Sequence, residues 1–126
     1  MNWLVLISGL FALSAVIGHF TMGNQSFLKP MMDASFDEVP KKVMQSVFHY
    51  ISVFLVLSAV VLILVGFGFI FNLSSNLLVR FIALNYLLFA LVQLIIALKS
   101  SIPRPLTKLF QWGLWIVIAI FAWLGA

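Results

Sequence analysis

The stretch that decides the fold covers residues 18–52 and reads GHFTMGNQSFLKPMMDASFDEVPKKVMQSVFHYIS. It contains both histidines, His19 and His49, all three acidic residues and four of the five methionines. The sequence on either side of it is mostly apolar. We therefore expect this stretch to join two membrane-spanning helices and to carry the side chains best suited to chemistry.

The composition places most of the chain in lipid. Of its 126 residues, 64% are hydrophobic and 8% are charged, whereas a soluble domain has about 25% charged residues. The mean hydropathy is +1.22, and a small soluble domain could not bury so much apolar surface. The seven Lys and Arg residues form no basic run, so we expect no nucleic-acid partner. The absence of cysteine excludes thiol chemistry and cysteine-ligated metal sites.

Four apolar runs predict four transmembrane helices, at about 2–22, 41–70, 77–98 and 106–124. Barrel strands would be about half as long as these runs, so the chain is expected to be all-α. We predict a single domain, an integral membrane protein whose four transmembrane helices form an up-down bundle. The first loop, 23–40, alternates apolar residues with a charge near its start, which predicts a short interfacial helix there.

The basic residues predict the orientation. Six of the seven lie in or beside the loops that follow the first and third helices, and only Arg80 lies on the opposite side. By the positive-inside rule, these two loops face the cytoplasm and both termini lie outside it. We expect a bacterial inner-membrane protein. Because four helices bury few side chains fully, we also expect a homo-oligomer, or a partner membrane subunit, within the lipid bilayer.

His19 and His49 form the strongest candidate site. The chain reverses between them, so the two side chains return to a similar depth on neighbouring helices. Each histidine also lies on a face of small or polar residues, and such faces let two helices approach closely. The faces are Ser8, Ala12, Ala15 and His19 on the first helix, and Gln45, His49, Ser52, Val56 and Ala59 on the second. We expect the two faces to meet.

Three interpretations of the two histidines stay open. They are neutral and structural, or they form a proton-responsive site, because an imidazole titrates near pH 6.5, or they bind a metal or haem. Met22 and Met44 lie near them in the sequence, and thioethers with imidazoles suit Cu(I). Two histidines at one depth could also ligate haem. The expectation is that the protein has no cofactor, with copper or haem as the alternatives.

Two further polar residues, Asn85 and Gln93, lie well inside the third predicted helix. Uncharged side chains of this kind form hydrogen bonds between helices in membranes. The alternative is a polar lining for a pathway through an oligomer. Hydrogen bonding to a neighbouring helix is the favoured interpretation, because one facing helix can satisfy each side chain.

The sequence has no phosphate-binding loop, dinucleotide fingerprint, Ser–His–Asp set or zinc-protease motif, so we do not expect an enzyme. The function we expect is that of an oligomeric channel or transporter-like protein, or of an accessory subunit of a membrane complex, with a proton-responsive site at His19 and His49. The alternatives are a copper- or haem-binding membrane protein and a lipid-binding structural scaffold.

Overall fold

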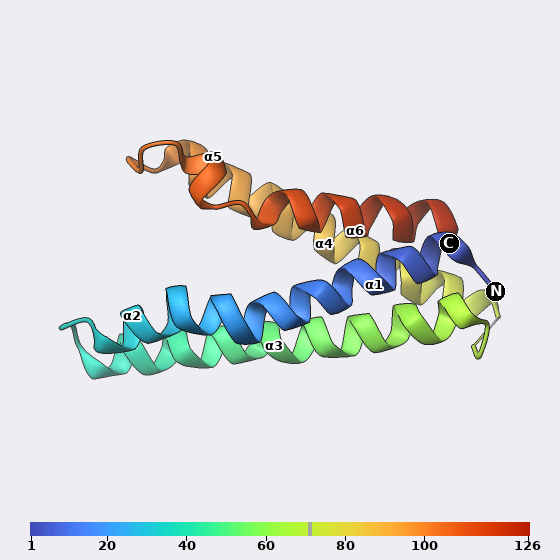
Figure 1. The fold of residues 1–126 in the computed structure, drawn as a ribbon, viewed down its shortest axis with the longest axis horizontal. Coiled ribbons are helices and arrows are strands. Elements are labelled where there is room, and N and C mark those ends of the chain that lie inside the picture. Colours follow the sequence, from blue (N-terminus) through green and yellow to red (C-terminus); the bar gives the residue numbers. More distant parts are fainter. Residues whose placement is uncertain (71) are drawn as a thin grey trace.

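A computed structural model describes residues 1–70 and 72–126, and all regular elements in these residues are helical (Figure 1). The prediction of an all-α chain is therefore confirmed for the part that the structure describes. Within these described residues, three helices are long and apolar enough to cross a membrane: Trp3–Asp33, Glu38–Phe67 and Leu73–Lys99. Their length and composition are those of a helical membrane protein.

The first helix is longer than its apolar run. It comprises α1 (Trp3–Gly18), the π-helical segment η1 (His19–Leu28) and α2 (Lys29–Asp33) without a break. The prediction that a loop begins at residue 23 is wrong, and α2 is a continuation of the helix rather than a separate interfacial one. Gly23 is buried, and its position faces the ring of Phe48. Packing against the next helix thus overrides the turn-forming tendency of the polar residues after Met22.

The second and third helices meet at a short connection. The α3 helix (Glu38–Phe67) ends at Gly68, whose φ of 84° is the left-handed conformation that a glycine adopts without strain. The α4 helix (Leu73–Lys99) begins four residues before the predicted residue 77. Asn72 caps it, because the Asn72 side chain accepts a hydrogen bond from Ser75 N at 2.8 Å and Ser75 Oγ accepts one from Asn72 N at 3.1 Å.

The predicted helix 106–124 is divided into two. A single turn, α5 (Pro105–Lys108), is followed by a break at Leu109 and then by α6 (Gln111–Gly125). With 15 residues, α6 is about 22 Å long, which is less than the roughly 30 Å of a hydrocarbon core. The prediction of one continuous helix over 106–124 is therefore wrong.

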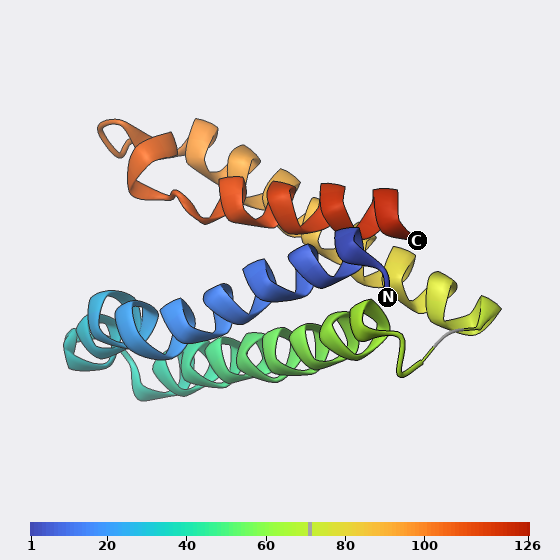
Figure 2. The ribbon, with the colours of Figure 1, turned by 45° about the vertical axis from the view of Figure 1, so that its right-hand side comes forward.

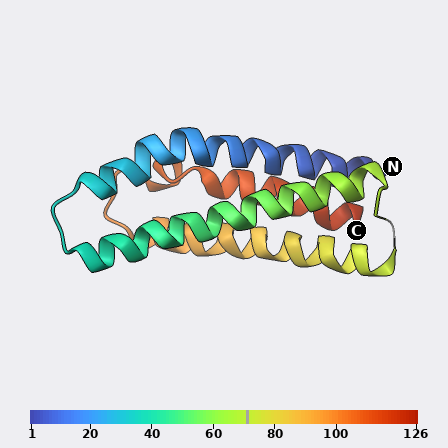
Figure 3. The same ribbon diagram turned by 90° about the horizontal axis from the view of Figure 1, so that it is seen from below.

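The helices pack as two hairpins. The first hairpin contains α1, η1, α2 and α3, and the second contains α4, α5 and α6. Successive long helices reverse direction, so the two ends of the chain lie close together (Figures 1 and 3). The α1 helix packs along both α3 and α6, and the ribbons of the two hairpins diverge toward the end that carries α2 and α5 (Figures 1 and 2).

Asn2 ties the hairpins together at the end where the termini meet. Its side-chain Nδ2 donates to Gly125 O at 2.6 Å, and its backbone N–H donates to Gly66 O at 2.7 Å. Gly66 allows α1 and α3 to touch there, since a Cβ at this position would lie 2.6 Å from the Cα of Leu6. The two hairpins are thus held closely at one end and less closely at the other.

Candidate functional site

His19 begins the π-helical segment and forms a hydrogen bond with the neighbouring helix. Its Nε2 lies 2.8 Å from Oγ of the buried Ser52, and this Oγ lies 3.1 Å from the carbonyl oxygen of Phe48. A carbonyl oxygen can only accept, so the Ser52 hydroxyl donates to Phe48 and accepts from Nε2–H of His19. The Nδ1 atom of His19 then keeps its lone pair and is the atom that would take up a proton.

Phe48 covers the imidazole of His19. The two rings stack with centroids 4.0 Å apart and planes at 17°. His49 follows Phe48 in the chain, touches the edge of its ring and is exposed. The expectation that His49 faces His19 is therefore wrong: the buried face of α3 passes through Phe48 and Ser52, about a quarter-turn away from His49.

The predicted face of α3, which runs through His49, contains other candidate residues that do not reach His19. The amide oxygen of Gln45 accepts a hydrogen bond from Lys42 Nζ at 3.3 Å, within one turn of the same helix. Val56 is exposed, whereas Ala59 is buried in the core. Ser52 is therefore the predicted site residue of α3 that the structure brings to His19.

His19 lies in the wall of a cleft between the two hairpins. This His19 cleft has a volume of about 430 Å³. Its polar side-chain groups belong to Ser14, His19, Gln93, Gln111 and, through the indole N–H, Trp115, and none of its lining side chains is acidic or carries a permanent charge. The remaining lining is apolar or aromatic: Ala15, Gly18, Met22, Gly23, Phe27, Phe48, Phe110, Leu114 and Trp115. Ligand sites in proteins have this makeup, with apolar walls and a few polar groups.

Gln93 and Gln111 join the two helices of the second hairpin. Nε2 of Gln93 donates to Oε1 of Gln111 at 2.6 Å. Oε1 of Gln93 is buried and has no donor among the described residues. A buried acceptor without a partner is rare in native proteins, and this one belongs to a residue of the cleft wall.

Gln93 is among the residues predicted from the sequence, whereas Gln111 is not. A signal was present, because the two glutamines are equally distant from residue 102, in the loop between their helices. Antiparallel helices place such residues side by side. The expectation that Asn85 bonds to a neighbouring helix is wrong, because its side chain donates to Phe81 O of its own helix at 2.8 Å. It is not a lining residue of the His19 cleft.

The four predicted metal ligands are not gathered in one place. Met22 lines the His19 cleft beside His19, but Met44 and His49 are exposed on α3 and lie outside its lining. Among the residues that the structure describes, no group of three or more His, Asp or Glu side chains is placed to hold a metal ion. Of the four predicted ligands, the cleft therefore brings together His19 and Met22.

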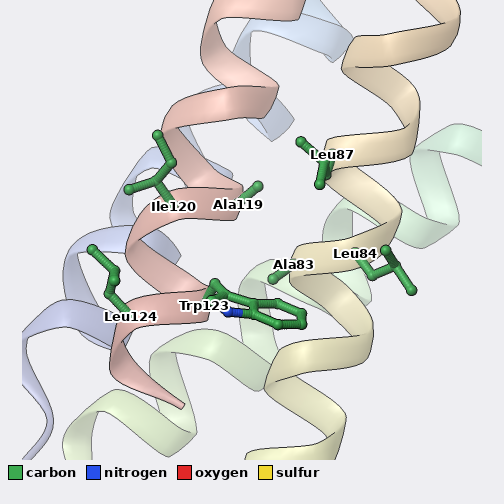
Figure 4. A pocket seen from close by; sticks show the side chains of 7 residues that line it. All are labelled: Ala83, Leu84, Leu87, Ala119, Ile120, Trp123 and Leu124. Carbon is green, nitrogen blue, oxygen red and sulfur yellow. The ribbon is translucent and has the colours of Figure 1, made fainter.

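A second hollow, which we call the Trp123 groove, lies between α4 and α6 (Figure 4). It has a volume of about 320 Å³, and the small side chains of Ala83 and Ala119 lie between the two helices there. Apart from the indole N–H of Trp123, the groove has no polar side-chain group. Its lining residues are Ala83, Leu84, Leu87, Ala119, Ile120, Trp123 and Leu124. Such a surface offers contact area for lipid or another helix, but no group for chemistry.

Profiles of protein families, curated proteins and solved structures were each compared with the chain, and none of them matches it.

Proposed function

We propose that this is a small, non-enzymatic multipass membrane protein of the channel or transporter type, or an accessory subunit of a membrane complex, and that His19 is its proton-responsive group. The observation that carries the proposal is the position of His19. Its ring is fixed by Ser52 and Phe48 in the wall of a cleft between two hairpins. A change of charge at this ring acts directly on the contact between the hairpins.

Protonation of Nδ1 places a positive charge in a wall that has no acidic side chain. The titratable neighbour of His19 on α3 is His49, and α4 and α6 contribute the uncharged Gln93 and Gln111 to the facing wall. A charge without a partner is costly in an apolar site. The charged ring therefore favours a wider, hydrated cleft, and the hairpins separate at the end where they already diverge.

The membrane arrangement is part of the proposal. The shorter α6 helix completes a fourth crossing beside the three long helices, so that the four form an up-down bundle in a bacterial inner membrane. The loops beside α2 and α5 face the cytoplasm and both termini lie outside it. The exposed outer faces of the helices are largely apolar, which suits contact with lipid and with further copies of the chain in a homo-oligomer.

The test compares the two histidines of the chain in liposomes. Ion flux and the mobility of a probe in the loop after α2 are measured between about pH 5 and 8, the range in which an imidazole titrates. We expect His19→Gln to remove the pH response and His49→Gln, at the exposed histidine, to keep it. A response that survives His19→Gln would show that His19 is only structural.

The same experiment separates a channel or transporter from an accessory subunit. A channel or transporter gives flux when the protein is reconstituted alone. An accessory subunit gives no flux by itself, but it keeps the pH-dependent loop mobility and is purified together with a membrane partner. The absence of both flux and pH-dependent mobility contradicts the proposal.

A further inference from the structure

We infer that the His19 cleft binds an uncharged, lipid-soluble ring compound that carries a hydroxyl group, in the class of phenols and hydroquinones. This inference rests on the proposed function, since it names the class of molecule that the same cleft admits. Three features of the cleft carry it: its aromatic walls, its hydrogen-bond acceptors and its lack of permanent charge.

The walls suit a flat ring. Four aromatic residues line the cleft, and they come from both hairpins: Phe27 and Phe48 from the first, and Phe110 and Trp115 from the second. Aromatic side chains pack against a ring in stacked or edge-to-face arrangements. The volume of about 430 Å³ also lies within the range of small-molecule sites.

The acceptor atoms of the cleft can bind a ligand that donates a hydrogen bond. Oε1 of Gln93 is a buried acceptor with no hydrogen-bond donor in the described part of the chain, and such an unpaired group is destabilising. Gln93 lines the cleft and the last side-chain torsion of a glutamine is soft, so we expect this oxygen to turn toward a donor in the cleft. Nδ1 of the neutral His19 offers a second acceptor in the same lining. A hydroxyl group supplies the donor that these atoms lack.

The lack of charge excludes other classes of ligand. No Lys or Arg in the lining would pair with a carboxylate or phosphate, and no Asp or Glu would pair with a cation. A lipid acyl chain could fill the apolar volume, but it would leave the Gln93 acceptor unpaired. An uncharged ring with a hydroxyl satisfies both the walls and the acceptor.

The first test measures the contribution of the hydroxyl. The full chain is placed in nanodiscs at about pH 8, where an ordinary imidazole is neutral, and is titrated with para-propylphenol or with propylbenzene, which lacks the hydroxyl. Empty nanodiscs correct for partition into lipid. We expect the phenol to bind more tightly, and Gln93→Leu to weaken its binding about fivefold, the effect of one neutral hydrogen bond, while propylbenzene binding is unchanged. Equal binding of both rings, or a Gln93→Leu variant that binds the phenol normally, overturns the inference.

The second test fills the cleft from a glycine at which an added Cβ has free space. A Cβ at Gly18 or at Gly113 would meet no atom within 4 Å, but only Gly18 lines the cleft. We expect Gly18→Leu to abolish phenol binding and Gly113→Leu to leave it unchanged, with circular dichroism confirming that both variants are folded. Normal phenol binding by folded Gly18→Leu overturns the inference.

The two proposals can fail separately. Binding is measured at one pH, whereas the response of His19 is measured across a range of pH. A pH response that depends on His19, without phenol binding, overturns the ligand class alone. Phenol binding that depends on Gln93, without a pH response, supports the ligand class and overturns the proton-responsive role.

Discussion

The hydroxyl of Tyr86 lies 2.7 Å from Oγ of Ser58, and this buried hydrogen bond joins α3 to α4. These helices touch far less than α1 touches α3 or α6, so the bond adds a specific link between hairpins that are held together mainly by α1 and α6. Ser58 Oγ also lies 3.1 Å from Leu55 O, to which it donates. Tyr86 is therefore the donor to Ser58.

The direction of this bond predicts unequal effects for its two partners. Tyr86→Phe leaves Ser58 bonded to Leu55, and we expect a loss of less than about 1 kcal/mol in the free energy of unfolding. Ser58→Ala leaves the Tyr86 hydroxyl buried without an acceptor, which costs about 1–3 kcal/mol. Unfolding in mixed detergent micelles measures both values. A larger loss for Tyr86→Phe than for Ser58→Ala would reverse our assignment of donor and acceptor.

The close contact of α1 with α3 predicts that Gly66 tolerates no side chain. A methyl group at this position would overlap the backbone of Leu6, so we expect Gly66→Ala to destabilise the protein by about 1–3 kcal/mol. Gly113→Ala is the matched control, because its Cβ enters open space and alanine is the better helix former by about 1 kcal/mol. Equal stability of the two variants in the same unfolding assay would contradict the observed packing.

The bond between His19 and Ser52 predicts a tautomer. Nε2 of His19 carries the proton in the neutral ring, because Ser52 accepts from it. We expect nitrogen NMR chemical shifts of His19 to show this single tautomer, and Ser52→Ala to produce a mixture of both. The same substitution should cost about 0.6 kcal/mol of stability, the average for a hydrogen bond between membrane helices. A proton on Nδ1 in the wild-type protein would disprove the assignment.

The proposed orientation can be tested with single cysteines, since the chain has none of its own. Ser74 and Ser101 are exposed near opposite ends of α4. A thiol reagent that does not cross membranes should label Ser74→Cys in intact cells, and Ser101→Cys only after the cells are opened. The opposite pattern would invert the proposed topology.

The long helices could be predicted because their apolar runs are longer than the core of a soluble protein requires. The residues at which these helices begin and end could not be predicted. The first helix passes through Asn24, Gln25 and Ser26, which favour turns in isolation. Tertiary contacts decide their conformation: Gly23 lies against Phe48, and Leu28 is buried. The break at Leu109 was not predicted either. Two prolines before a helix normally mark the start of that helix, whereas here they precede a single isolated turn.

Part of the candidate site could be predicted from the sequence, but the face of α3 that meets His19 could not. Ser52 and Ala59 belong to two overlapping faces of α3, one through His49 and the other through Phe48. The helical period of about 3.6 residues does not tell which of the two faces is buried, because both faces contain Ser52 and Ala59. Contact with the first helix distinguishes them, and the contact observed is the ring of Phe48 stacked on His19.

The shortness of α6 has a consequence for the surrounding lipid. Its 15 residues extend about 22 Å, beside the 27 residues and about 40 Å of α4. In the proposed four-crossing topology, this hydrophobic mismatch thins the bilayer locally next to α6, at a cost of a fraction of a kcal/mol per Å. Lipid headgroups are then drawn toward the level of Phe110 and Gln111, in the wall of the His19 cleft. The length of the surrounding acyl chains thereby sets how readily a molecule dissolved in the membrane enters the cleft.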